Sequence, residues 1–233
     1  MVKEFQSHIA FLYIEKSVFT LENIDLVIFD LDGTLLDSLD ELVTALNRAL
    51  SDNGSAEVDP ALLKKKFCYG TQSLLTDYVG AEPHLHQAIY ADYITHYRDI
   101  MFESPLFEGV TSLLADLEGQ KKMAILTNKR EQTSLTLLKH YAIDQLFTPI
   151  IGGDTLSVKK PSPVPIEHIC RHLQIAPAQT LMVGDSHSDI LAGNAAGTAT
   201  LGVLNGFTTS EMLEEAQPDL IINSIAEMKS LLR

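Results

Sequence analysis

The sequence predicts an α/β protein in which helices cover both faces of a parallel sheet and an all-helical segment follows the first strand. Short apolar runs end in polar residues, as buried parallel strands do, and the three clearest are 25–30, 122–127 and 180–185. Amphipathic stretches with helical spacing separate these runs. Residues 38–105 contain helical patterns and no convincing strand. Together these observations favour one sheet with an insertion.

Strands and helices are expected to alternate through most of the chain. Three weaker strands are expected at 149–151, 199–203 and 219–222. Helices are expected at 131–141, 163–173, 188–196, 210–216 and 225–232. A strand, a helix and a second strand in succession are typical of a parallel sheet.

The inserted segment has its own helix signals. Asp59 is a good N-cap, and Pro60 suits the first helical position. Helical stretches follow at 61–67, 72–79 and 84–101. We therefore predict an N-terminal extension at 1–24, a core formed by 25–37 and 106–233, and a helical cap at 38–105.

Composition limits the class of partner. The 233 residues include 17 Lys and Arg against 31 Asp and Glu, a net charge of −14, which disfavours nucleic acid or an anionic membrane. Cys68 and Cys170 fit a reducing compartment. No apolar run approaches the roughly 20 residues of a membrane helix, and residues 1–24 lack the features of a signal peptide. We expect a cytoplasmic protein.

Polar residues at three strand ends predict a functional site. They are Asp30 and Asp32, Thr127 and Asn128, and Asp185 and Asp189. Each pair alone could be a turn or a helix cap. In an open parallel sheet, ligands bind beyond the carboxyl ends of the strands, so all three pairs should meet at one edge.

These residues form four motifs in a recognisable order. The motifs are Asp30-Leu31-Asp32-Gly33-Thr34, Thr127 after its strand, Lys160 before Pro161, and Gly184-Asp185 with Asp189. They resemble the four motifs of the haloacid dehalogenase superfamily of phosphohydrolases. The segments 127–129, 151–154, 159–161 and 196–197 are most similar to the phosphoglycolate phosphatase group.

This resemblance implies a Rossmann-like three-layer core with a helical cap. It also implies Mg²⁺-dependent hydrolysis of a small phosphomonoester, with 2-phosphoglycolate as a candidate, through an aspartyl-phosphate. Asp30 would be the nucleophile and Asp32 the general acid and base. Thr127 would donate its hydroxyl to the phosphate, and Lys160 would balance negative charge.

The resemblance implies the ligands as well. The expected metal ligands are Asp30, Asp32 through its backbone carbonyl, Asp185 and Asp189. Asp189 could also hold a metal-bound water or Lys160 in place, and it could cap a helix at the same time. The expected substrate contacts are Gly33, Asn128, Lys160, and Tyr69 and Thr71 in the cap. Additional positive charge could come from Lys129, Arg130 and the lysines at 64–66. The partner would be a small phosphorylated metabolite, and the protein a monomer or homodimer.

Other functions stay open at this point. A phosphomutase of the β-phosphoglucomutase type also uses a pair of aspartates, although Thr34 favours a phosphatase. Pyrophosphate and nucleotide monophosphates are alternative substrates. A non-catalytic interaction protein would have no reason to keep both Asp30 and Asp32. Ser162 and the N-terminal arm depart from the phosphoglycolate phosphatase group.

Overall fold

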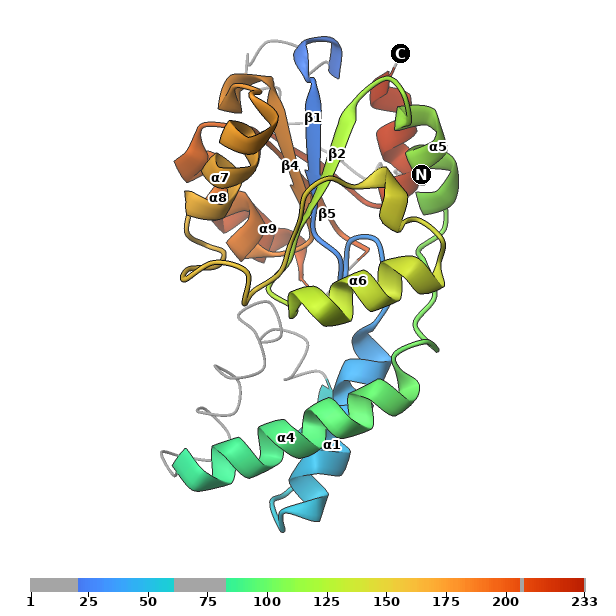
Figure 1. Cartoon of the computed structure of the whole chain (residues 1–233), viewed down its shortest axis with the longest axis vertical. Helices are drawn as coiled ribbons and strands as arrows, with labels where there is room; N and C mark the ends of the chain where they lie inside the picture. The colour runs from blue at the N-terminus through green and yellow to red at the C-terminus, as the bar shows by residue number, and fades with distance from the viewer. Residues whose placement is uncertain (1–20, 61–82, 206–207, 233) are drawn as a thin grey trace, which may run out of the picture.

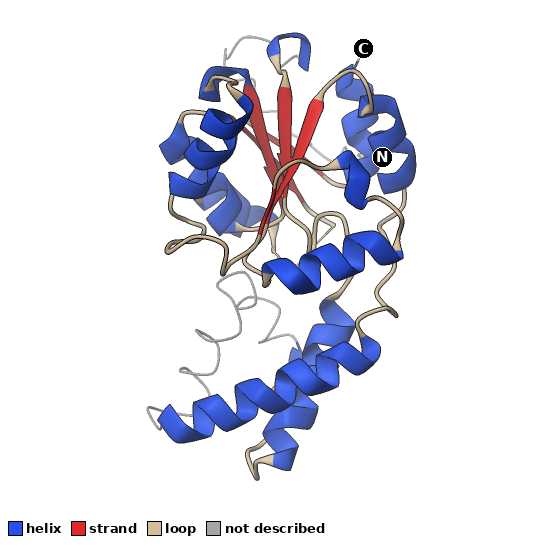
Figure 2. Cartoon of the chain, in the orientation of Figure 1, coloured by secondary structure: helices blue, strands red, loops and turns tan. Residues whose placement is uncertain are grey.

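The protein is built around one six-stranded parallel sheet. The computed structural model describes residues 21–60, 83–205 and 208–232. The strand order is β3-β2-β1-β4-β5-β6, and the sheet lies between helices (Figures 1 and 2). The strands are β1 Leu26–Phe29, β2 Lys122–Leu126, β3 Ile150–Ile151, β4 Thr180–Gly184, β5 Ala199–Val203 and β6 Leu220–Ile222. All six lie where the apolar runs predicted them.

The register of the central strands brings three polar segments to the same edge. Phe29 of β1 pairs with Ile125 of β2 on one side and with Val183 of β4 on the other. The ladder continues past the strand end, because the amide of Asp30 donates to the carbonyl of Val183 at 2.9 Å. The residues that follow these three strands therefore emerge together.

Alternate residues of β1 pack into two separate apolar layers. Val27 and Phe29 belong to the larger cluster, which includes Leu113 of α5 and Leu137 of α6. Leu26 and Ile28 belong to a second cluster with Ile166 and Ile169 of α7. The helices of the core are α5 Val110–Leu117, α6 Glu131–His140, α7 Val164–Leu173, α8 His187–Ala196 and α9 Ser210–Glu215. The predicted three-layer α/β fold is confirmed.

Two features differ from the sequence-based expectations. Helix α5 was not predicted, although Val110, Leu113, Leu114 and Leu117 have helical spacing and are all buried. Residues 225–232 form a 3₁₀ helix, η5 Ile225–Leu232, rather than an α-helix. Shorter 3₁₀ helices are η1 Leu21–Asn23, η3 Asp144–Leu146 and η4 Pro177–Gln179. No helix in the described ranges is both long and apolar enough to span a bilayer.

Two helices of the inserted segment lie beyond the carboxyl ends of the strands (Figure 1). They are α1 Leu39–Asp52 and α4 Pro83–Ile100, which pack against each other. The two connections to the core run together, because the amide of Asp37 donates to the carbonyl of Pro105 at 2.9 Å. These helices are part of the segment that we propose as a cap. The predicted cap contacts Tyr69 and Thr71, and the lysines at 64–66, lie outside the described residues.

Candidate active site

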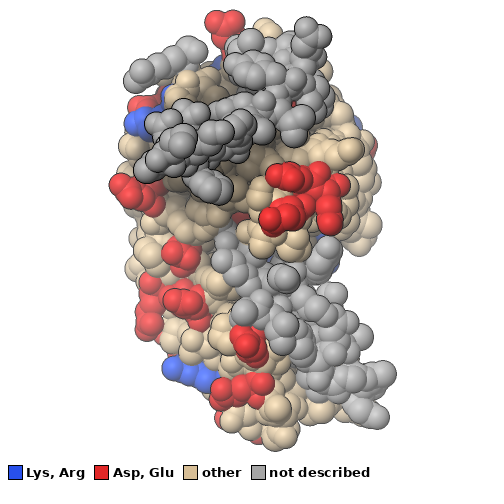
Figure 3. All heavy atoms as spheres, turned by 180° about the vertical axis from the view of Figure 1, so that it is seen from behind, with Lys and Arg blue, Asp and Glu red and all other residues tan. Residues whose placement is uncertain are grey.

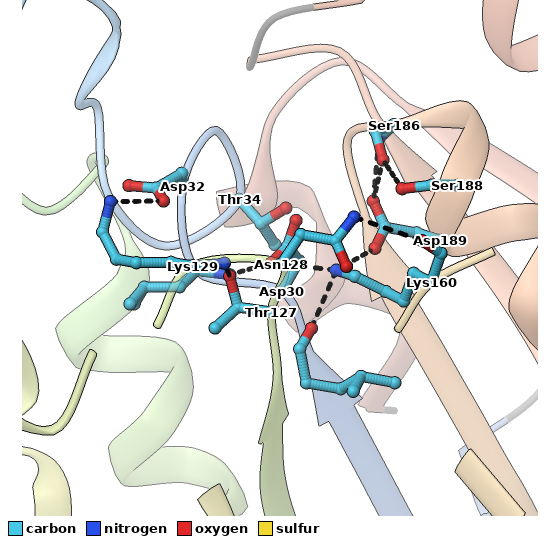
Figure 4. A network of polar contacts seen from close by, with 12 residues as sticks. Asp30, Asp32, Thr34, Thr127, Asn128, Lys129, Lys160, Ser186, Ser188 and Asp189 are labelled. Carbon is cyan, nitrogen blue, oxygen red and sulfur yellow. Dashed lines mark hydrogen bonds and ion pairs between the residues drawn. The ribbon is translucent and has the colours of Figure 1, made fainter. Parts of the chain in front are cut away.

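Asp30 lies at the centre of the site, directly after β1 (Figure 4). Its side-chain Oδ1 accepts a hydrogen bond from the amide of Leu31 at 2.7 Å and lies 3.0 Å from Nζ of Lys160. Asp30 is only 8% exposed. Burial raises the pKa of its carboxyl to about 7; Lys160 acts against this rise and Asp189 adds to it.

Lys160 is the buried cation of the site and is 2% exposed. Its Nζ donates to Oδ1 of Asp189 at 2.5 Å and to the carbonyl of Leu126 at 2.8 Å. Burial alone would lower the pKa of Lys160, but its ion pairs with Asp189 and Asp30 outweigh burial, so the pKa lies above its usual value. Lys160 therefore remains protonated. The neighbouring Lys159 is exposed, so Lys160 is the lysine that points inward.

Asp189 serves both Lys160 and helix α8. Its Oδ2 accepts hydrogen bonds from the amide of Ser186 at 3.0 Å and from the Ser186 hydroxyl at 2.6 Å. This is a capping box at the start of α8. The end of β4 lies very close to the Asp189 carboxylate, so a side chain at Gly184 would collide with it. The contacts of Asp189 thus support two of the expected roles, capping and holding Lys160.

Three buried carboxylates could hold a divalent cation. One oxygen of each of Asp30, Asp185 and Asp189 lies within 4.8 Å of the others. Gly33 has φ +79°, and a side chain there would collide with the Asp185 carboxylate, so the backbone after Asp32 lies against this cluster. Hard carboxylate and carbonyl oxygens suit Mg²⁺. Asp30 and Asp189 share the single ammonium of Lys160, so a further cation fits this donor set.

Asp32 lies on the side of the site that faces the inserted helices. Its Oδ1 accepts a hydrogen bond from the Ser38 hydroxyl at 2.6 Å, and Nζ of Lys129 lies 2.7 Å from its Oδ2. The Lys129 ammonium is also 4.5 Å from the centre of the Tyr97 ring of α4. The two predicted carboxylates thus have separate partners, Lys160 for Asp30 and Lys129 for Asp32.

The residues after β2 complete the core side of the site. Thr127 is buried, and its hydroxyl accepts a hydrogen bond from the amide of Lys129 at 3.2 Å. The side-chain amide of Asn128 donates to the carbonyl of Lys160 at 3.3 Å. The structure therefore brings together the predicted site residues of the core, whereas Tyr69 and Thr71 lie outside the described residues.

A pocket of about 370 Å³ lies between these residues and the inserted helices. On the core side it is lined by Asp30, Asp32, Thr127, Asn128 and Asp185, among others. On the other side it is lined by Leu42 of α1 and by Tyr90, Tyr93, Ile94, Tyr97 and Arg98 of α4. This face of α4 was not predicted from the sequence. Its signal is the spacing of 90, 93, 94, 97 and 98, which places these residues on one side of a helix.

The fold and the site together define a class of protein. An aspartate directly after the first strand, a buried lysine and an acidic cluster lie at the same sheet edge. The model of the family described as haloacid dehalogenase-like hydrolase matches residues 27–203. The chain belongs to this family, and the predicted membership is confirmed.

Similar proteins cover almost the whole chain. The phosphoglycolate phosphatase of Chromobacterium violaceum is 35% identical over 221 residues, which are 91% of this chain and 98% of that protein. That of Neisseria meningitidis is 33% identical over 219 residues, or 89% and 93% of the two chains. The crystal structure of a predicted phosphoglycolate phosphatase from Haemophilus somnus has a TM-score of 0.84 and 27% identity, covering 91% and 99%.

Proposed function

We propose that the protein is a Mg²⁺-dependent phosphatase that hydrolyses 2-phosphoglycolate through an aspartyl-phosphate on Asp30. The observation that carries this proposal is the placement of Asp30, which lines the pocket while its Oδ1 is held by the Leu31 amide and Lys160. The names of these relatives, which are matched over 98% and 93% of their own length, support this substrate. The composition of the chain is consistent with a cytoplasmic enzyme.

In the first step, Asp30 attacks phosphorus and the bond to the leaving oxygen breaks. The Leu31 amide and the Lys160 ammonium both contact Oδ1 of Asp30, so we assign Oδ2 as the attacking oxygen. The Lys160 ammonium keeps the Asp30 side chain in position and offsets its charge. A covalent intermediate divides the hydrolysis into two easier displacements.

Asp32 is the proposed acid and base. It would protonate the leaving oxygen and then remove a proton from the water that cleaves the aspartyl-phosphate. Its carboxylate is bound to Lys129 and Ser38 in the structure. The Asp32 carboxylate must therefore release Lys129 before it can contact the leaving oxygen of the substrate.

The remaining core residues would hold the phosphoryl group and the cation. The Thr127 hydroxyl and the backbone amides near Gly33 and Asn128 are suited to bind phosphate oxygens. Asp30, the backbone carbonyl of Asp32 and Asp185 would hold Mg²⁺, and Asp189 would support Lys160. When bound, Mg²⁺ would reduce the repulsion between the Asp30 carboxylate and the phosphate dianion.

The proposal is tested by measuring phosphate release from 2-phosphoglycolate and from a panel of other phosphomonoesters. With Mg²⁺ we expect hydrolysis, with 2-phosphoglycolate giving the highest kcat/KM. After treatment with a chelator, kcat should fall by more than about 100-fold, and added Mg²⁺ should restore it. Full activity in metal-free buffer would show that the reaction does not need Mg²⁺. A kcat/KM for 2-phosphoglycolate well below that of other phosphomonoesters would show that the substrate assignment is wrong.

Replacing Asp32 by asparagine should slow alkyl phosphates more than aryl phosphates. An alkoxide is a poor leaving group that needs the proton from Asp32, and general acid catalysis contributes about 10²–10⁴-fold. Aryl phosphates have good leaving groups, so kcat for their hydrolysis should fall much less. The measurement is kcat for one ester of each kind. Asp40→Asn, at an exposed residue of α1, is the control. Equal losses on both esters would contradict the assigned role.

A further inference from the structure

The charges around the pocket raise a problem for any acidic substrate. The protein carries a net charge of −14, and the face seen in Figure 3 bears several acidic groups and few basic ones. Asp30, Asp32, Asp154 and Asp185 all line the pocket. A leaving group with its own negative charge therefore needs a cation that is not already committed to a carboxylate.

Most basic side chains of the site are committed in this way. Lys160 lies against Asp30 and Asp189. Lys129 pairs with Asp32 at 2.7 Å. Arg130 pairs with Asp154 at 2.9 Å. These cations balance the acidic residues of the enzyme itself.

Among the described residues that line the pocket, two cations remain, Arg98 and Lys159. Both line the pocket and are exposed. Within the described ranges, no ion pair or hydrogen bond is found for either side chain. They differ in position, because Lys159 directly precedes Lys160 on the core side, whereas Arg98 belongs to α4 on the opposite side.

The geometry of the reaction distinguishes these two cations. In phosphoryl transfer, the attacking and leaving oxygens lie roughly in line on opposite sides of phosphorus. Asp30 attacks from the edge of the sheet, so the leaving group points away from the sheet, toward the inserted helices. Helix α4 crosses beyond the strand ends on that side (Figure 1). Arg98 thus belongs to the side of the pocket toward which the leaving group points, whereas Lys159 belongs to the core side.

The surroundings of Arg98 favour a directed contact. Tyr90, Ile94 and Tyr97 line the pocket on the same face of α4. A substrate bound against this apolar surface would displace water from around the exposed Arg98 guanidinium, which would strengthen an ion pair. The planar guanidinium can donate two parallel hydrogen bonds to a carboxylate, a geometry that lysine lacks.

We propose that Arg98 is a specificity-determining residue that binds a carboxylate on the leaving group of the substrate. This inference rests on the proposed phosphatase function and refines it: the preferred substrates are compact phosphomonoesters of hydroxy acids. Arg98 binds the acid group while Asp30 and the residues around it act on the phosphate. Neutral alcohol phosphates react by the same chemistry without this contact.

The test compares 2-phosphoglycolate with its carboxamide, which has almost the same size and no carboxylate charge. The readout is the ratio of kcat/KM for the two substrates, in the wild type and in Arg98→Met, Arg98→Lys and Lys159→Met. In Arg98→Met the ratio should fall by about 10- to 100-fold, the effect of one hydrogen-bonded charge. In Arg98→Lys the ratio should lie between that of Arg98→Met and that of the wild type. Lys159→Met, and Arg48→Met at an exposed position on α1, should change the ratio by less than about 3-fold.

The possible outcomes separate the two proposals. A wild type that hydrolyses neither substrate overturns the proposed function. A wild type that hydrolyses both equally well overturns the role of Arg98 and leaves the phosphatase chemistry intact. The same holds if Arg98→Met leaves the ratio unchanged, or if Lys159→Met rather than Arg98→Met lowers it.

Discussion

Replacing Asp30 by asparagine should lower kcat by at least about 10³-fold on every phosphomonoester, because it removes the nucleophile and leaves the side-chain volume almost unchanged. The loss should be the same for good and poor leaving groups, since no substrate can avoid the first displacement. The measurement is kcat in the presence of saturating Mg²⁺. A matched control is Asp25→Asn, an exposed aspartate just before the opposite end of β1, which should retain full activity.

The Asp30→Asn protein should also remain folded. Burial already raises the pKa of this carboxyl to about 7, so the charged form is costly to bury and the neutral amide is tolerated in its place. We expect a thermal unfolding midpoint close to that of the wild type. A variant with activity within about 10-fold of the wild type would show that another group attacks phosphorus.

Replacing Lys160 by methionine should destabilise the fold as well as abolish activity. The variant would leave Asp30 and Asp189 buried without their cation, and breaking a buried ion pair in this way costs about 3–5 kcal/mol. The free energy of unfolding can be measured by urea denaturation. Lys159→Met is the matched control, because this exposed neighbour should change stability by less than about 0.5 kcal/mol.

The destabilisation should depend on pH. A carboxyl whose pKa is higher in the folded than in the unfolded state binds a proton more readily when folded, so its contribution to stability falls as pH rises between the two pKa values. For Asp30 this range begins near 4, the unfolded value, and reaches about 7 even with Lys160 present. The loss in Lys160→Met should therefore be greater at pH 8 than at pH 5. Equal stability of the Lys159 and Lys160 variants at pH 8 would contradict the role of Lys160.

The sequence alone determined the sheet and the centre of the site. The central strands β1 and β4 are buried on both faces, so they appear as continuous apolar runs with polar residues at their ends. Parallel strands bring these ends to one edge, which is why Asp30, Thr127 and Asp185 could be grouped in advance. Helix α5 has the apolar spacing of a helix, but it begins after Gly109, which has no side chain to cap it, so the usual start signal is absent and the helix was missed.

Only the tertiary structure decided how the site is connected and what faces it. Lys159 and Lys160 are equivalent in a local pattern, and only the family resemblance assigned Lys160 in advance. Lys160 points inward because Asp30 and Asp189, distant in the sequence, lie where its ammonium can reach them. The α4 face with Arg98 likewise has an ordinary helical pattern. It becomes a wall of the pocket because the paired connections near Asp37 and Pro105 hold α1 and α4 beyond the strand ends. The local periodicity of the sequence predicts which residues share one face of a helix. Which part of the protein that face contacts is determined by packing between segments that are far apart in the chain.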